Sequence, residues 1–129
     1  MTDKEKLVLK KIGKAKSVIN EIQNLLQFGY YNTAVNRLYY ASFYAVQALL
    51  ANTDIFPKSH KGVLNMFSLH FVRENKIPVQ LSDFYAVIFN ERQLADYDDD
   101  SEFDKETAEA YFSLATEFLA YIEKLLDKK

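Results

Sequence analysis

Apolar residues recur at three- and four-residue steps along most of this chain, the spacing that places them on one face of an α-helix. The pattern breaks at Gly29, at Pro57, at Pro78 and in an acidic run from Asp96 to Asp104. Glycine readily caps helices and proline cannot continue one, so each break predicts a helix end. We predict helices over residues 4–27, 31–51, 59–75, 80–96 and from the acidic run to residue 127. Strand signals are weak, so the predicted fold is all-α, an antiparallel bundle of four to five helices.

The predicted helices differ in how much of their surface is apolar. The stretch 31–51 is apolar on nearly every side, which predicts a helix surrounded by other helices, or buried partly by a second subunit. The first and last helices each carry one apolar stripe. In the first helix the stripe consists of Val8, Ile12, Ala15, Ile19, Ile22 and Leu26. In the last it consists of Phe103, Thr107, Tyr111, Leu114, Phe118, Tyr121 and Leu125.

Length and composition limit the class of protein. A chain of 129 residues has the length of one domain, so we expect a single helical domain over residues 1–129. It has no cysteine, which excludes disulfides, thiolate zinc sites and cysteine nucleophiles. The charged amino terminus does not resemble a signal peptide and no apolar run could span a membrane, so we expect a cytoplasmic protein without a membrane partner. The net charge of −2 argues against a DNA-coating protein, and we expect no sequence-specific DNA binding.

Two strongly apolar helical stretches carry polar groups that need partners. One contains Asn36, Arg37 and Tyr40, and the other contains Arg92 and Asp96. Polar groups are costly to bury alone, so we expect the two stretches to meet. In a structural interpretation, Arg92 and Asp96 form an ion pair within one helix and Asn36 is a satisfied core amide. In a functional interpretation, Asn36, Arg37 and Arg92 line a pocket for a phosphate or a nucleotide, because a planar guanidinium suits a phosphate.

A second polar cluster lies at the predicted start of the third helix. Lys58, His60 and Lys61 surround Ser59, the predicted N-cap. Free backbone N–H groups and the helix dipole favour anions at such a position, so His60 and Lys61 are candidate ligand-binding residues. The alternative is an ordinary solvated helix start, since positive residues are common on surfaces.

Other familiar chemistries lack support in the sequence. It contains no glycine-rich phosphate loop, HExxH helix, serine nucleophile elbow or pair of His ligands. The acidic run has the alternate carboxylates of a calcium loop, but Ser101 stands where glycine is expected and Thr107 where the closing glutamate belongs. We therefore predict no metal site and no cofactor.

Three motifs in order resemble the HEPN domain: residues 36–43 (NRLYYASF), 57–62 (PKSHKG) and 91–97 (ERQLADY). The chain is most similar to the short, stand-alone prokaryotic HEPN proteins, and the resemblance covers nearly its whole length. It implies a helical bundle that commonly dimerises, with the second and fourth helices lining a shared cleft. It also implies association with a small nucleotidyltransferase, often as a toxin–antitoxin or defence pair.

The resemblance also implies candidate site residues. Many HEPN domains are metal-independent ribonucleases whose fourth helix carries an Arg and a His separated by four to six residues, supported by a polar residue on the second helix. Arg92 matches the Arg and Asn36 matches the polar residue. The His is missing, because Tyr97, Asp98 and Asp99 occupy its window.

Three hypotheses of function remain open. In the first, the chain is a homodimeric module that binds a nucleotide or RNA and works with a nucleotidyltransferase. Arg92 and Arg37 would hold phosphate, Asn36 would orient it, and two tyrosines, Tyr40 and Tyr97, would flank it.

The second hypothesis is a ribonuclease toxin in which Arg92 acts with Asp96, Tyr97 or His60. Arg92 could stabilise charge at the phosphate, whereas a tyrosine titrates too high to be a good base unless strongly perturbed. His60 could substitute only if the fold brings the start of the third helix to the cleft. The third hypothesis is a helical partner subunit without a ligand.

Overall fold

The chain folds into helices joined by short connections. The computed structural model describes residues 1–97 and 102–127, and for residues 94–97 it describes the backbone alone. The elements are α1 (Asp3–Gln27), α2 (Tyr31–Asn52), α3 (His60–Phe67), the π-helical segment η1 (Ser68–Val72), α4 (Val79–Tyr97) and α5 (Lys105–Asp127). Within the described residues there is no strand, and the all-α prediction is confirmed.

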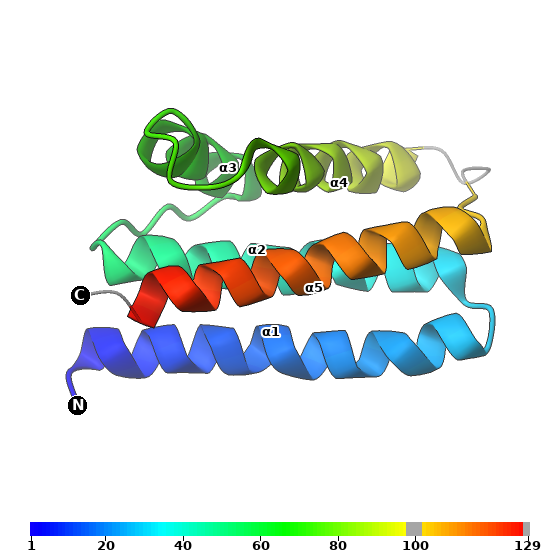
Figure 1. Cartoon of the computed structure of the whole chain (residues 1–129), viewed down its shortest axis with the longest axis horizontal. Coiled ribbons are helices and arrows are strands. Elements are labelled where there is room, and N and C mark those ends of the chain that lie inside the picture. Colours follow the sequence, from blue (N-terminus) through cyan, green and yellow to red (C-terminus); the bar gives the residue numbers. More distant parts are fainter. Residues whose placement is uncertain (98–101, 128–129) are drawn as a thin grey trace.

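The helices lie in three levels (Figure 1). α1 forms one side, α2 and α5 form the middle, and α3 and α4 form the other side, with successive long helices antiparallel. α2 contacts α1, α3, α4 and α5, and thirteen of its 22 residues are buried. Its apolar surface on nearly every side is therefore covered by helices of the same chain.

Local sequence signals set both ends of α1. At its start, Thr2 and Glu5 form a capping box in which the Glu5 backbone N–H donates to Thr2 Oγ1 at 3.1 Å. At its end, Gly29 adopts a left-handed φ of 82°, and its N–H donates to the Leu26 carbonyl at 3.2 Å. The chain then turns directly into α2.

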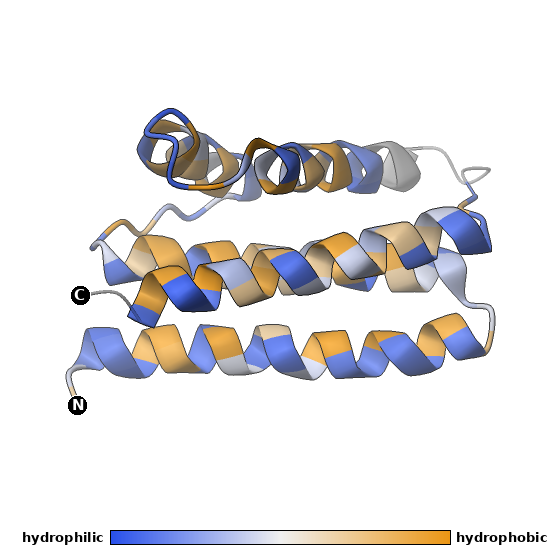
Figure 2. Cartoon of the chain, viewed as in Figure 1, coloured by the Kyte–Doolittle hydropathy of each residue, from blue (hydrophilic) through white to orange (hydrophobic). Residues whose placement is uncertain are grey.

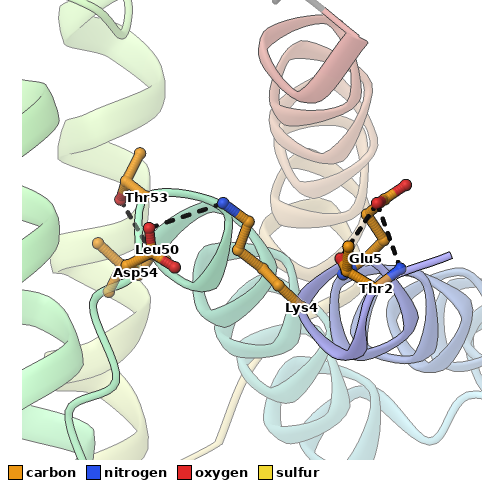
Figure 3. Close-up of polar contacts among 6 residues, drawn as sticks. All are labelled: Thr2, Lys4, Glu5, Leu50, Thr53 and Asp54. Atoms are coloured by element: carbon orange, nitrogen blue, oxygen red, sulfur yellow. Dashed lines mark hydrogen bonds and ion pairs between the residues drawn. The ribbon is translucent and has the colours of Figure 1, made fainter.

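The start of α1 lies beside the end of α2 (Figure 3). Lys4 Nζ is 3.6 Å from a carboxylate oxygen of Asp54, and Thr53 Oγ1 donates to the Leu50 carbonyl at 2.9 Å. Asp54 has a φ of 63°, so the chain leaves α2 through a left-handed residue. Both charged side chains of the ion pair are well exposed, so the pair contributes little to stability.

The hydropathy pattern places the core between the levels. Figure 2 shows α1 with its hydrophobic positions toward α2 and α5 and its hydrophilic positions on the outer side. The buried stripe of α5 differs from the predicted one. Among the residues predicted to form it, only Phe118 is buried, and the others are half-buried. The buried residues of α5 are Ala108, Ala115, Phe118, Leu119 and Ile122. Two small alanines let α5 lie close to its neighbours, which a pattern of large apolar residues does not reveal.

The third predicted helix is one helix in sequence but two in the structure. α3 ends at Phe67 and continues into the π-helical segment η1, after which Asn75 takes a φ of 55°. The register of a π-segment depends on local packing, so the hydrophobic period did not predict it. Among the described helices, none combines the length and the apolar character needed to cross a membrane.

Candidate functional site

Arg92 of α4 lies over two adjacent tyrosines of α2. Its guanidinium carbon is 5.0 Å from the centre of the Tyr39 ring and 5.4 Å from that of Tyr40. Arg92 and Tyr40 are half-buried, whereas Tyr39 is fully buried. The faces of aromatic rings attract a cation, so these contacts hold the guanidinium at the boundary between core and solvent.

His60 is held at the first position of α3. The preceding Ser59 caps the helix, because its Oγ accepts a hydrogen bond from the Gly62 backbone N–H at 2.8 Å. A side chain at Gly62 would begin 2.8 Å from that same oxygen, so glycine leaves room for the cap. The sequence Ser-His-Lys-Gly therefore fixes the backbone that carries His60.

The His60 ring contacts three aromatic residues of α2. Its Nδ1 is 2.7 Å from Tyr39 Oη, within hydrogen-bonding distance. The ring also stacks on Phe43, with 4.3 Å between ring centres, and meets Tyr40 edge-on at 6.0 Å. A hydrogen bond and two ring contacts fix the imidazole in one orientation and leave Nε2 without a hydrogen bond to the described part of the chain.

The environment shifts the titration of both hydrogen-bonded partners. Burial lowers the pKa of His60, and the nearby Arg92 charge lowers it further. Burial raises the pKa of Tyr39 to about 12, although Arg92 acts in the opposite direction. Near neutral pH the site therefore combines a neutral imidazole, a protonated phenol and a permanent guanidinium charge.

A second tyrosine lies behind Tyr39 in the core. The Tyr85 ring of α4 stacks on Tyr39 with 6.3 Å between ring centres. Burial, together with the neighbouring Tyr39 phenol, raises the pKa of Tyr85 well above its ordinary value. Its buried hydroxyl makes no hydrogen bond with any described residue. This aromatic wall excludes water from one side of the Arg92–His60 site.

Residues 9–125 match the HEPN domain. The chain belongs to the HEPN family. It is 40% identical to "Putative toxin MJ0142" of Methanocaldococcus jannaschii over 93% of this chain and 82% of that protein. It is 35% identical to a "UPF0332 protein" of Thermotoga maritima over 98% of this chain and 96% of that protein. It is also 38% identical to "Putative toxin MJ0605" of M. jannaschii, over 74% of this chain and 71% of that protein.

This HEPN domain brings together three of the residues selected from its sequence. Arg92, Tyr40 and His60 are in mutual contact through the tyrosine rings. The start of the third helix does reach the second helix, and His60 lies close enough to Arg92 of the fourth helix for the arginine charge to act on it, which was the condition for any role of His60. A histidine therefore lies near Arg92, but it comes from α3, whereas the family pattern places the histidine on the fourth helix.

The other predicted ligand-binding residues lie on α2 and α3 but make no described contact with the His60 ring. Arg37 forms an ion pair with Glu21 of α1 at 3.4 Å, and about a third of its side chain is exposed. Asn36 and Lys61 are exposed on α2 and α3. Among the described contacts, none joins these residues to Arg92 or to His60.

Two predicted catalytic residues cannot be placed by their side chains. Asp96 and Tyr97 belong to the last turn of α4, but their side chains lie outside the described residues. The predicted Arg92–Asp96 ion pair is outside them for the same reason. Within the described chain, no group of three His, Cys, Asp or Glu side chains is arranged to hold a metal ion.

Sequence reasoning missed Tyr39 and Phe43 as parts of the site. Both lie in the NRLYYASF motif, one turn apart on α2, and both contact His60. A pair of successive tyrosines before a buried phenylalanine was the available signal. It could not be used without knowing that the start of α3 packs on this face.

Proposed function

We propose that this HEPN protein is a toxin-type subunit that binds RNA at the surface formed by Arg92, His60, Tyr39 and Tyr40. The observation that supports this most directly is the convergence of Arg92 and His60, from two helices, on the same tyrosines of a third. Relatives that carry the name of toxins support the broader role.

The chemistry of the site favours RNA over a small uncharged ligand. A guanidinium binds phosphate through parallel hydrogen bonds, and aromatic rings provide surfaces on which bases stack. Tyr40 and His60 are both half-buried, so part of each ring faces solvent. A nucleotide that places its phosphate at Arg92 would bring its base or ribose to these rings. The overall net charge of −2 does not oppose this, because the site needs only a local positive charge.

A second candidate function, a metal-independent ribonuclease, is favoured by the state of His60. In the tautomer with Nδ1 protonated, the ring donates to Tyr39 Oη and leaves the Nε2 lone pair available. Nε2 would take the proton of a ribose 2′-hydroxyl, and the 2′ oxygen would attack the adjacent phosphorus. The bond to the 5′ oxygen would break, giving a 2′,3′-cyclic phosphate and, after proton return from His60, a 5′-hydroxyl. Arg92 would stabilise the charge on the phosphate oxygens.

We propose a homodimer and a small nucleotidyltransferase as partners. Both follow from the HEPN family, in which the two proteins commonly form a toxin–antitoxin or defence pair. The many exposed charges of this chain also suit a partner that restrains a toxin by binding its surface. Size-exclusion chromatography with light scattering tests the dimer, and co-purification with a candidate small nucleotidyltransferase tests the pair.

The RNA proposal is tested by fluorescence anisotropy with a labelled single-stranded oligouridylate. We expect Arg92→Ala to weaken binding strongly and to change the thermal midpoint little. Arg73→Ala is the matched control, because Arg73 is an exposed arginine at the end of η1. Absence of binding by the unmodified protein, or equal affinity of Arg92→Ala and Arg73→Ala, would contradict the proposal and leave a helical partner subunit without an RNA ligand.

The ribonuclease candidate is tested with the same RNA in the presence of a metal chelator. We expect slow cleavage that ends in a cyclic phosphate and is lost in both Arg92→Ala and His60→Ala. His70→Ala is the control, since His70 is exposed on η1. Binding without cleavage would retain the RNA-binding module and exclude the enzyme.

A further inference from the structure

A second cluster of cations and aromatic rings lies next to the Arg92 site. Tyr44 of α2 has two lysines of α1 over its ring, Lys11 at 5.6 Å and Lys14 at 5.5 Å from the ring centre. Tyr44 is half-buried, so part of its ring is open to solvent. Tyr40 joins this cluster to the first site, because it lies 6.3 Å from Tyr44 and also beneath Arg92.

The two lysines carry charge that the described protein does not neutralise. Between residues 4 and 16 the sequence has six lysines and one acidic residue. Burial lowers the pKa of Lys11, and the adjacent charges of Lys14 and Lys10 lower it further. Neither Lys11 nor Lys14 has an acidic partner among the described side chains, although Lys4 and Lys16 do. Crowded like charges favour the binding of an anion.

A small cavity borders the same cluster. It has a volume of about 130 Å³ and is lined partly by Lys11 and Gln47. The buried Gln47 Oε1 has no hydrogen-bond partner among the described residues. An unpaired buried acceptor is unfavourable, and a bound group that donates a hydrogen bond would remove this cost.

We propose that Lys11, Lys14 and Tyr44 form a second subsite for single-stranded RNA, which extends the path of the strand from Arg92 across Tyr40 to α1. Arg92 binds one phosphate, the two lysines bind a later one, and the rings of Tyr40 and Tyr44 meet the bases between them. Alternating cations and aromatic rings along a groove are the usual means of binding a single strand without reading its sequence. This inference rests on the proposed RNA-binding function. It adds the path that the RNA takes over the surface and the requirement that the RNA be single-stranded.

The test compares two double variants by anisotropy with two RNA lengths. Lys11→Gln with Lys14→Gln removes the subsite charges. Lys76→Gln with Lys124→Gln is the matched control, because Lys76 lies over the Phe71 ring at 5.5 Å and Lys124 is exposed on α5. The ligands are a uridine dinucleotide, which reaches only the Arg92 site, and a twelve-nucleotide oligouridylate.

We expect the subsite variant to bind the long strand roughly tenfold more weakly at low salt and the dinucleotide unchanged. The slope of log affinity against log salt should fall by about 0.7 for the long strand, the value for one phosphate contact to a single strand. The control variant should keep both values. The substitution of the two lysines should weaken the binding of a twelve-base-pair RNA duplex less than it weakens the binding of the single strand, because the bases of a duplex cannot reach Tyr44.

The outcomes separate this inference from the proposed function. If the unmodified protein binds neither RNA, the proposed function and the subsite both fail. If Arg92→Ala loses binding but the subsite variant matches the lysine control, the subsite alone fails and the lysine stems merely cover Tyr44. If duplex and single strand lose affinity equally, the path for a single strand is wrong. Circular dichroism and thermal unfolding of each variant exclude a loss of folding as the cause.

Discussion

Two arginines of the chain lie in opposite surroundings although both occur in similar apolar helical stretches. Arg37, on the side of α2 that faces α1, forms an ion pair with Glu21. Arg92 lies over Tyr39 and Tyr40, on the side of α2 that faces α3 and α4. A carboxylate partly cancels the charge of the guanidinium that it binds, whereas the face of an aromatic ring attracts a guanidinium without adding an opposite charge. The described contacts of the two arginines therefore differ in kind, and RNA binding can test whether this difference matters.

The largest expected effect is the difference between these two arginines in RNA binding. Arg92→Ala should lower affinity by about 2 kcal/mol, or roughly thirtyfold, the usual value for a hydrogen bond to a charged group. Arg37→Ala should change affinity less than about threefold, because a partly exposed arginine that already has a carboxylate partner loses little. Anisotropy titrations at one salt concentration give both values. A larger loss of RNA affinity in Arg37→Ala than in Arg92→Ala would contradict this prediction.

The next effect concerns the hydroxyl that holds His60. Tyr39→Phe should reduce the free energy of unfolding by about 1 kcal/mol, because His60 Nδ1 loses its 2.7 Å partner. Tyr40→Phe is the matched control, since the described chain has no hydrogen bond to the Tyr40 hydroxyl, and its effect should stay below about 0.5 kcal/mol. Urea denaturation measures both. Equal losses in the two variants would mean that the His60 hydrogen bond contributes nothing to stability.

A smaller effect follows from the titration of His60. Burial and Arg92 lower its pKa in the folded state below the ordinary value of 6.5, so the unfolded chain binds the proton more readily. The resulting stability is complete above pH 6.5 and is lost as the pH falls through the window between 6.5 and the lowered pKa. His60→Gln removes this part of the pH dependence, so the difference in stability between wild type and variant should narrow on acidification.

The measurement is urea denaturation at several pH values between 5 and 8, with His70→Gln as the control because His70 is exposed on η1. NMR titration of the two histidines reads the pKa of His60 directly. A pKa of His60 at or above 6.5, or a difference from His60→Gln that widens as the pH falls, is incompatible with the buried, cation-adjacent position.

The sequence predicted the helices better than it predicted their faces. Gly29, Pro57 and Pro78 act through the backbone alone, so they mark helix ends whatever the tertiary packing. The buried stripe of α5 depends instead on how closely Ala108 and Ala115 approach other helices. The π-helical segment η1 likewise depends on packing around α3.

The candidate site shows the same division. Arg92, Tyr40 and His60 were selected from their own chemistry, and they lie together. Tyr39 was missed because its importance comes from a contact with α3, which lies 21 residues further along the chain. The pairing of Arg37 with Glu21 spans 16 residues and joins two helices, so no local pattern could reveal it. The Ser59 cap, an interaction within one helical turn, was predictable, and the contacts between helices required the fold.

The smallest expected effect concerns Glu21, the carboxylate partner of Arg37. Glu21→Gln removes the carboxylate from Arg37 and should raise affinity for the oligouridylate about twofold at low salt, because the freed guanidinium adds to the field of the lysines on α1. The gain should vanish at roughly 0.5 M salt, where charges more than a few ångströms apart are screened. Glu109→Gln is the control, since it removes an equal charge that pairs with Lys105 on α5. An equal gain in both variants would reflect net charge alone. A gain restricted to Glu21→Gln, and abolished by adding Arg37→Ala, would mean that Arg37 is a phosphate ligand which its carboxylate partner keeps weak.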